Sequence, residues 1–232
     1  EPALPAAPPT GHAIAIRGLR FAWAADRPAV FDGLDLDVPE GARVALLGPS
    51  GAGKSSLAAL LLKQAAPQAG TITLGGVDIA TLSADSLRAR IGILSQDARL
   101  FAGSVAENLR LAAPEADDPA LWQALDAARI GDLIRALPEG LATEVGEGGI
   151  RFSGGEARRI ALARALLSPA PVLILDEPAA GLDAATERAF LETLGTATAG
   201  RTVILILHGL TGVERPTRIL RLIGGRAVAA TG

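Results

Sequence analysis

A glycine-rich stretch at residues 48–55 constrains the fold more than any other feature of the sequence. It reads Gly-Pro-Ser-Gly-Ala-Gly-Lys-Ser and matches the pattern Gly-x-x-x-x-Gly-Lys-Ser/Thr in full. Residues 43–47 before it form a mostly apolar run of strand length, and residues 55–64 after it have a helical pattern. Glycines let successive backbone N–H groups face inward, and a helix N-terminus adds its dipole. The stretch therefore predicts a strand, a polyphosphate-binding loop and a helix, in that order.

Within this loop, Lys54 is expected to reach the β- and γ-phosphates of a nucleotide, and the Ser55 hydroxyl to bind Mg²⁺. The alternative is a chance glycine-rich turn, but a predicted strand before the loop and a predicted helix after it argue against that alternative. The residues expected to contact the nucleotide here are Gly48, Pro49, Ser50, Gly51, Ala52, Gly53, Lys54, Ser55 and Ser56.

Two adjacent carboxylates follow a second predicted strand. Residues 172–175 are apolar, and Asp176 and Glu177 come directly after them, where ligands bind in open α/β sheets. Asp176 can hold Mg²⁺, while Glu177 can accept a proton from a water that attacks the γ-phosphate. The alternative is a solvated acidic turn before Pro178, and the phosphate-binding loop elsewhere in the chain favours the catalytic interpretation.

A Ser-Gly-Gly-Glu stretch at residues 153–156 precedes another helical pattern. Ser153 and Glu156 satisfy the capping-box pattern, which explains both residues without any ligand. It does not explain Gly154 and Gly155, because a glycine inside a helical turn costs up to ~1 kcal/mol. These glycines would let an anion approach the helix N-terminus closely.

Composition removes several classes of function. Charged residues make up 20% of the chain and the net charge is −3, which disfavours a nucleic-acid partner. The chain has no cysteine, so disulfides, thiolate metal sites and a cysteine nucleophile are excluded. Although 49% of the residues are hydrophobic, no apolar stretch approaches the roughly 20 residues needed to span a bilayer.

The order of the predicted elements indicates an α/β fold with a mainly parallel sheet. Residues 14–23 and 34–38 alternate apolar and polar side chains and predict an antiparallel edge. Between residues 96 and 168 strand patterns give way to helical ones, which predicts an inserted helical subdomain. Buried strands are predicted at 43–47, 71–74, 91–94, 172–175 and 203–207, helices in the insertion at 104–111, 119–128 and 156–167, and a closing hairpin at 218–223 and 226–229.

Residues 1–13 are rich in proline and alanine, a composition that favours extended conformers, and we expect a linker from an upstream membrane domain. The remaining residues, 14–232, are expected to form one domain. Its core would comprise 14–95 and 169–232, and its helical subdomain 96–168.

The phosphate-binding loop, Ser-Gly-Gly-Glu at 153–156 and Leu-Asp-Glu-Pro at 175–178, in this order, resemble an ABC ATPase. The resemblance covers nearly the whole chain after the linker. It implies a P-loop NTPase with a RecA-like core and an antiparallel β-subdomain, with ATP and Mg²⁺ as ligands and ATP hydrolysis as the activity. It also implies that Ser153, Gly154 and Gly155 bind the γ-phosphate held by the opposite subunit, and that Asp183 crosses the interface between the two subunits.

The same resemblance assigns three more residues. Gln96 would sense Mg²⁺ and the attacking water, and His208 would contact the γ-phosphate, although by itself a lone histidine at a strand end is more often structural. Trp23 would stack on adenine, where tyrosine is more usual in the family, and ordinary strand packing is its alternative.

Residues 100–109 and 143–147 resemble the exporter type of cassette. The second segment resembles the one through which exporters sense their membrane helices. Glu156, Ala157-Arg158-Arg159 and residues 179–183 (Ala-Ala-Gly-Leu-Asp) resemble the C subunit of heterodimeric bacterial thiol exporters needed for cytochrome bd assembly. This resemblance implies glutathione or cysteine as cargo, a membrane domain on the same chain and a different second subunit. It also implies a soluble domain at the cytoplasmic face of the bacterial inner membrane.

Four alternatives remain open. An exporter cassette could serve a lipid, a peptide or a drug. A binding module could dimerise on ATP with little hydrolysis, which Glu177 argues against. A soluble ABC-type ATPase of DNA repair or translation is opposed by the acidic charge balance. A small-molecule kinase with the same loop would not need Ser153, Gly154 and Gly155.

Overall fold

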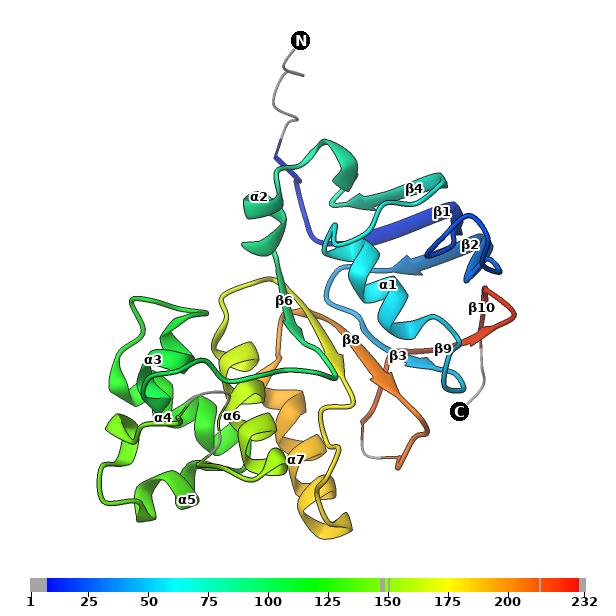
Figure 1. Ribbon diagram of the computed structural model, residues 1–232. Helices are drawn as coiled ribbons and strands as arrows, with labels where there is room; N and C mark the ends of the chain where they lie inside the picture. The colour runs from blue at the N-terminus through cyan, green and yellow to red at the C-terminus, as the bar shows by residue number, and fades with distance from the viewer. Residues whose placement is uncertain (1–7, 147–148, 150, 213, 230–232) are drawn as a thin grey trace.

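The computed structural model describes residues 8–146, 149, 151–212 and 214–229, and these contain two sheets (Figure 1). The larger sheet has the strand order β10-β9-β3-β8-β7-β6. Its neighbours from β9 to β6 pair in parallel, and only β10 runs antiparallel, as the second strand of the predicted hairpin. The predicted mainly parallel sheet is therefore confirmed. Its strands are β3 (Arg43–Leu47), β6 (Ile91–Leu94), β7 (Val172–Asp176), β8 (Thr202–Leu207), β9 (Arg218–Ile223) and β10 (Arg226–Ala229).

The central strands β7 and β8 are buried along their whole length, as expected for parallel strands covered on both faces. Successive residues point to opposite faces, so Leu173 and Leu175 enter one hydrophobic core while Val172 and Ile174 enter the other. In the register of the sheet, Leu47 lies opposite Leu207, and Asp176 opposite Ile206. The loops that follow β3, β7 and β8 therefore leave the sheet at one edge.

The smaller sheet is antiparallel, with the order β2-β1-β4-β5. The antiparallel edge predicted near the start of the chain is thus a separate sheet. Residues 71–74, predicted as a buried strand, belong to β4 of this sheet and are only half buried, with Thr71 exposed and Leu74 buried. The reason is pairing: β4 lies beside β1, where one face meets solvent. The strands are β1 (Ile14–Phe21), β2 (Phe31–Val38), β4 (Ala69–Leu74) and β5 (Val77–Asp78).

Residues 8–13 are the described part of the predicted linker, and they lie against this small sheet. Pro9 is buried, the backbone N–H of His12 donates to Glu40 at 3.1 Å, and the carbonyl of Ala13 accepts from Gly75. A Cβ at Gly75 would meet backbone atoms of Gly11, so a glycine allows this close approach of the two backbones. This part of the predicted linker is thus attached to the domain, and residues 1–7 lie outside the described residues.

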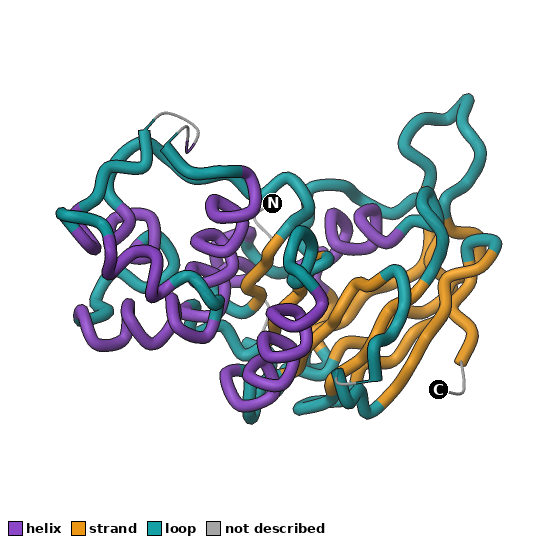
Figure 2. The backbone as a smooth tube through the Cα atoms, turned by 90° about the horizontal axis from the view of Figure 1, so that it is seen from below, coloured by secondary structure: helices purple, strands orange, loops and turns teal. Residues whose placement is uncertain are grey.

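In the described part of residues 96–168, four α-helices and a 3₁₀ helix at Gly140–Ala142 gather into a helical lobe (Figure 2). The three helices predicted there are present, with bounds shifted by one or two residues. Capping explains their starts, because Ser104, Asp117 and Ser153 each accept a backbone N–H in the first turn. The lobe contains α3 (Val105–Arg110), α4 (Asp118–Ala127), α5 (Gly131–Ala136) and α6 (Gly154–Leu167).

Three further helices pack on the sheets: α1 (Lys54–Leu61), α2 (Ala84–Arg88) and α7 (Ala184–Ala197). The sequence patterns did not reveal α2, α5 or α7. The first two are short, and α7 contains Thr and Gly residues of low helical propensity. None of the described helices has the length and apolar character needed to cross a membrane.

Candidate functional site

The phosphate-binding loop has the predicted geometry. It leaves β3 after Leu47 and enters α1 at Lys54, and Gly51 and Gly53 adopt positive φ angles of 78° and 97°. A Cβ at Gly53 would lie 2.6 Å from Val30 and 2.8 Å from the ring of Phe31. Among the described residues no side chain caps the N-terminus of α1, so its first N–H groups point into the loop without a side-chain partner. This arrangement fits a bound anion.

The Lys54 side chain lies inside the loop. It is only 8% exposed, and its ammonium donates to the carbonyls of Gly48 at 2.7 Å and Pro49 at 3.0 Å. These two bonds hold the positive charge beside the N-terminus of α1, where phosphates would bind.

Asp176 and Glu177 lie beside this loop at the end of β7. Asp176 is buried, and its Oδ2 atom is 3.5 Å from the Ser55 hydroxyl, which donates to it. Burial raises the pKa of Asp176 and the charge of Glu177 raises it further, while the nearby Arg158 and Lys54 charges lower it. The structure therefore brings Ser55 and Asp176 together, as the sequence predicted.

The donors Ser55 and Asp176 fit Mg²⁺, a hard cation that takes one or two protein oxygens and completes its shell with water and substrate phosphates. The described residues hold no cluster of three or more acidic, His or Cys side chains that would enclose a metal without substrate. Gln96, also predicted as a ligand, follows β6 at the same edge of the sheet, and its side chain is exposed.

Glu177 has an unusual backbone and a close neighbour. Its φ angle is +48°, a left-handed conformation that costs a non-glycine residue roughly 1–2 kcal/mol. Its N–H donates to the carbonyl of Ile206. Its Oε1 atom lies 2.6 Å from Nε2 of His208, an ion pair when the imidazole is protonated. The end of β8 thus places His208 against the proposed base, a contact between side chains that the sequence did not reveal.

Trp23 lies next to the start of helix α1, which follows the phosphate-binding loop. Its ring is 56% exposed, packs edge-on against Phe21 and donates its indole N–H to the Ser56 hydroxyl at 3.0 Å. This places an open aromatic face beside the phosphate-binding residues, as stacking on a base requires. Trp23 lies two residues beyond Phe21, where β1 ends, so the strand predicted at 14–23 is shorter than expected and Trp23 is not a strand residue.

Four predicted residues lie outside the phosphate-binding loop, at the starts of α6 and α7: Ser153, Gly154, Gly155 and Asp183. The first three begin α6 in the helical lobe, Ser153 and Gly154 are exposed, and the predicted capping box between Ser153 and Glu156 is present (Figure 1). Asp183 is the N-cap of α7, and hydrogen bonds from Thr186 hold its pKa below the ordinary value. Among the described contacts, no hydrogen bond links these residues to the phosphate-binding loop.

Sequence reasoning missed Arg158, on the second turn of α6. Its guanidinium donates to backbone carbonyls at the ends of two neighbouring strands: Gln96 after β6 at 2.6 Å, and Asp176 and Glu177 at 2.5 and 3.1 Å. Arg158 lies close to the Ser-Gly-Gly-Glu stretch in the sequence, but the carbonyls that it binds lie 18 to 62 positions away.

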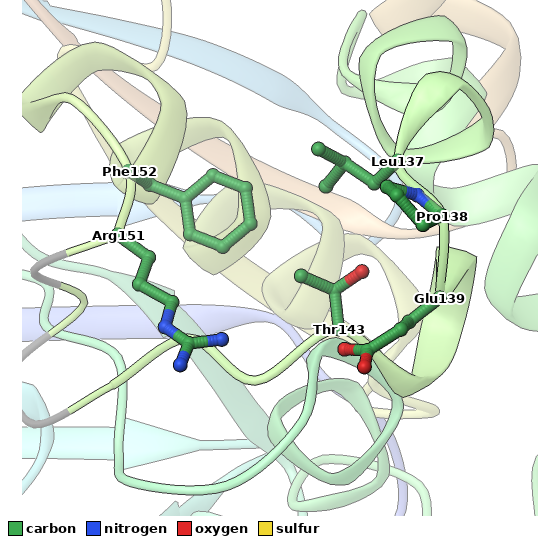
Figure 3. Close-up of a pocket in the computed structure, with 6 residues that line it drawn as sticks. All are labelled: Leu137, Pro138, Glu139, Thr143, Arg151 and Phe152. Carbon is green, nitrogen blue, oxygen red and sulfur yellow. The ribbon is translucent and has the colours of Figure 1, made fainter.

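A shallow hollow lies on the helical lobe, just before Ser153 (Figure 3). Arg151 and Phe152 border one side, and Leu137, Pro138 and Glu139 the other. Thr143 of the exporter-like segment also lines it. Glu147, which ends that segment, lies outside the described residues.

The loop after His208 is held by a buried acid, Glu214. Its carboxylate accepts from the N–H groups of Thr211 and Gly212 and from the Thr211 hydroxyl. Burial alone would raise the pKa of Glu214, but these hydrogen bonds outweigh burial and lower it from the ordinary 4.5. A lowered folded-state pKa means that this stabilisation is present above the ordinary glutamate pKa. It is lost as the pH falls through that value to the folded pKa.

We therefore expect Glu214→Gln to lower the free energy of unfolding by roughly 1–3 kcal/mol near neutral pH, because an amide accepts these bonds less strongly than a carboxylate. The difference from wild type should shrink as the pH falls from about 4.5, the ordinary glutamate pKa, through the lower folded-state pKa, where wild-type Glu214 becomes neutral in the native protein. Urea unfolding at a series of pH values measures this. A difference that does not change with pH would mean that the charge of Glu214 contributes nothing.

A phosphate-binding loop between a strand and a helix, with two carboxylates at the end of a neighbouring parallel strand, defines a nucleotide-binding protein of the P-loop class. More narrowly, the profile of the family described as ABC transporter matches residues 31–180, and the chain belongs to that family. The predicted resemblance to ABC cassettes of the exporter type is thereby confirmed, and the fold is that of an ABC ATPase domain.

The names of similar proteins state different transported substrates. The chain is 40% identical over 215 residues, 93% of its length, to an ATP-dependent lipid A-core flippase of Neisseria gonorrhoeae. It is also 40% identical over 213 residues, 92% of its length, to the glutathione/L-cysteine transport system ATP-binding/permease protein CydD of Bacillus subtilis. A bacterial Atm1-family ABC exporter with ATP bound superposes with a TM-score of 0.90 at 38% identity, over 98% of this chain and 40% of the other. The chain spans only 35% and 36% of the lengths of the two curated relatives.

Proposed function

We propose that this domain binds and hydrolyses Mg-ATP to drive a membrane transporter. One observation carries the proposal: the phosphate-binding loop, Asp176 and Glu177 lie side by side at one edge of the same parallel sheet. In this arrangement a nucleotide held by the loop would present its γ-phosphate to the carboxylates.

Each side chain has a step to perform. Lys54 and the N–H groups at the start of α1 would bind the phosphates, while Ser55 and Asp176 would hold Mg²⁺, which would supply charge neutralisation for phosphoryl transfer. A water attacks the γ-phosphorus, the bond to the β-phosphate oxygen breaks, and Glu177 accepts the proton of that water. His208 would contact the γ-phosphate, and its contact with Glu177 would also orient that carboxylate. Gln96, which follows β6 beside β7, would sense Mg²⁺ and the attacking water.

The remaining predicted residues suit a site shared between two subunits. Ser153 and Gly154 are exposed on the lobe, where Ser153, Gly154 and Gly155 could meet the nucleotide of a second subunit through the N-terminus of α6. Asp183 begins α7 at the surface and would lie at the contact between the two cassettes. We propose that ATP binding closes two cassettes and that hydrolysis reopens them.

A membrane domain on the same polypeptide is the proposed partner of this ATP-binding domain. Two findings support this partner. The chain covers only 36% of the length of the Bacillus subtilis relative, and that relative is named an ATP-binding/permease protein. Two exposed apolar side chains, Phe101 and Leu111, border one groove between the helical lobe and strand β6, which suits docking of an apolar segment. The domain would then work at the cytoplasmic face of the bacterial inner membrane.

For the cargo we propose thiol reductants such as glutathione or cysteine, exported for cytochrome bd assembly with a different second subunit. The support is the similarity to CydD and the variant Glu156, Ala157-Arg158-Arg159 stretch. The lipid A-core flippase is equally similar and favours lipid export as the second candidate. Inverted membrane vesicles that contain the full-length transporter should accumulate labelled glutathione or cysteine when ATP is added. Movement of labelled lipid instead would establish the second candidate.

Phosphate release from Mg-ATP by the purified chain, mixed with its partner cassette, tests the proposed activity. Turnover that requires Mg²⁺ and saturates with ATP supports an ATPase. ATP binding without turnover would instead establish an ATP-gated binding module and contradict the proposed hydrolysis.

We expect Trp23→Ala to weaken ATP binding by about 1–3 kcal/mol, roughly 5- to 150-fold in Kd, because the stacking surface is lost. Trp23→Phe is the matched control, since it keeps a ring but loses the indole bond to Ser56. Calorimetric titration with ATP measures both variants. Unchanged affinity in the alanine variant would mean that Trp23 only packs against Phe21.

A further inference from the structure

The guanidinium of Arg158 joins three parts of the molecule that are separate in sequence. One terminal nitrogen donates to the carbonyl of Gln96 at 2.6 Å, and the other to those of Asp176 and Glu177 at 2.5 and 3.1 Å. These carbonyls lie at or just after the ends of strands β6 and β7, which are direct neighbours in the sheet. The planar fork of an arginine can hold two such backbones at once, and a lysine ammonium cannot.

These contacts are with backbone atoms, so they act on the position of the chain. The carbonyl of Asp176 belongs to the peptide that enters Glu177, and Glu177 holds a left-handed φ of +48°. A shift of that peptide would turn the Glu177 carboxylate away from His208, 2.6 Å away. Arg158 is only partly exposed, its Nε is buried, and no partner for this atom is found among the described residues. Partial burial of a charged side chain costs free energy unless its hydrogen bonds compensate. The bonds of Arg158 to the three carbonyls supply that compensation.

We propose that Arg158 is a positioning residue that couples helix α6 to the catalytic carboxylate. It holds the peptides around Gln96 and Glu177 in one fixed arrangement with the helix that also carries Ser153, Gly154 and Gly155. A displacement of α6 thereby changes the orientation of Glu177 without touching the nucleotide. This inference rests on the proposed ATPase function.

Variants of Arg158 separate positioning from folding. Arg158→Gln should lower kcat at least about tenfold, because a small misplacement of a catalytic group has a large effect on rate. The Kd for Mg-ATP should stay within about twofold, since no contact of Arg158 binds the nucleotide. Arg158→Lys, which keeps the charge but not the fork, should recover only part of the loss, and millimolar guanidinium should partly restore Arg158→Ala. The matched control is Arg20→Gln, because the Arg20 side chain is 63% exposed and pairs only with Asp32 among the described residues.

A second measurement does not depend on hydrolysis. The chain contains two histidines, and His12 lies on the small sheet beside Glu40, away from the site. Without nucleotide, the imidazole NMR resonances of His208 should shift in Arg158→Gln and Arg158→Lys, while those of His12 stay in place. Wild-type kcat in all Arg158 variants, or unmoved His208 resonances, would overturn the inference. Absence of turnover in the wild type would instead overturn the proposed function, and the histidine spectra would still decide the positioning role.

Discussion

Replacing Glu177 by glutamine is expected to lower Mg-ATP turnover by roughly 10²- to 10⁴-fold, the usual contribution of a general base. The amide keeps the size of the side chain but cannot accept a proton from the attacking water. ATP binding should remain within about threefold of wild type, because in the proposed site Lys54 and the N-terminus of α1, not Glu177, would hold the phosphates. Phosphate release and equilibrium titration with ATP, measured on the same preparation, check both expectations.

The matched control is Glu115→Gln, an exposed glutamate of the helical lobe, which should hydrolyse ATP like the wild type. Turnover in Glu177→Gln equal to that of the control would mean that Glu177 is not the base. The site would then be regulatory, and hydrolysis would have to be sought in the partner cassette.

Gly53→Ala is expected to lower the free energy of unfolding by about 2–5 kcal/mol and to abolish ATP binding. Two physical terms add: a left-handed φ costs an alanine ~1–2 kcal/mol, and an overpacked core ~1–3 kcal/mol. The new Cβ would lie 2.6 Å from Val30 and 2.8 Å from Phe31, which is fully buried and has no room to retreat. Relief of the clash must move the backbone that curls around the phosphates.

Gly51→Ala provides the comparison, because Gly51 also has a positive φ of 78°, but a Cβ added there would meet no described atom within 4 Å. It should lose only the backbone term of ~1–2 kcal/mol. Chemical unfolding monitored by circular dichroism measures both variants. Equal losses in the two proteins would show that the contact with Val30 and Phe31 is relieved without cost.

Together the two expectations separate the binding part of the site from its chemical part. Gly53 shapes the loop, and its effect is on stability and affinity. In the proposed mechanism Glu177 contributes only to the reaction, so its replacement is expected to affect kcat. An exporter cassette that needs both will fail in different ways: the Gly53 variant should not close on ATP, whereas the Glu177 variant should close and remain closed.

Much of the architecture was predictable because it depends on short segments. The phosphate-binding loop, the strands of the larger sheet, the capped starts of α3 and α6 and the closing hairpin all depend on residues within a few positions of one another. The sheet membership of residues 71–74 was not predictable in this way. The local pattern of a strand does not determine which strand it pairs with. Residues 71–74 pair with β1, and Thr73 bonds to Ala15, 58 positions earlier in the chain.

The sequence by itself determined which chemistry is possible, because Lys54, Ser55, Asp176 and Glu177 follow strands whose ends must meet at one edge of a parallel sheet. Only the tertiary structure decided how these groups are oriented. The contact of His208 with Glu177, the indole bond of Trp23 to Ser56 and the three carbonyls held by Arg158 join distant segments. Local patterns do not encode such contacts, since they arise when separate elements pack around shared cores and bring side chains together across the fold.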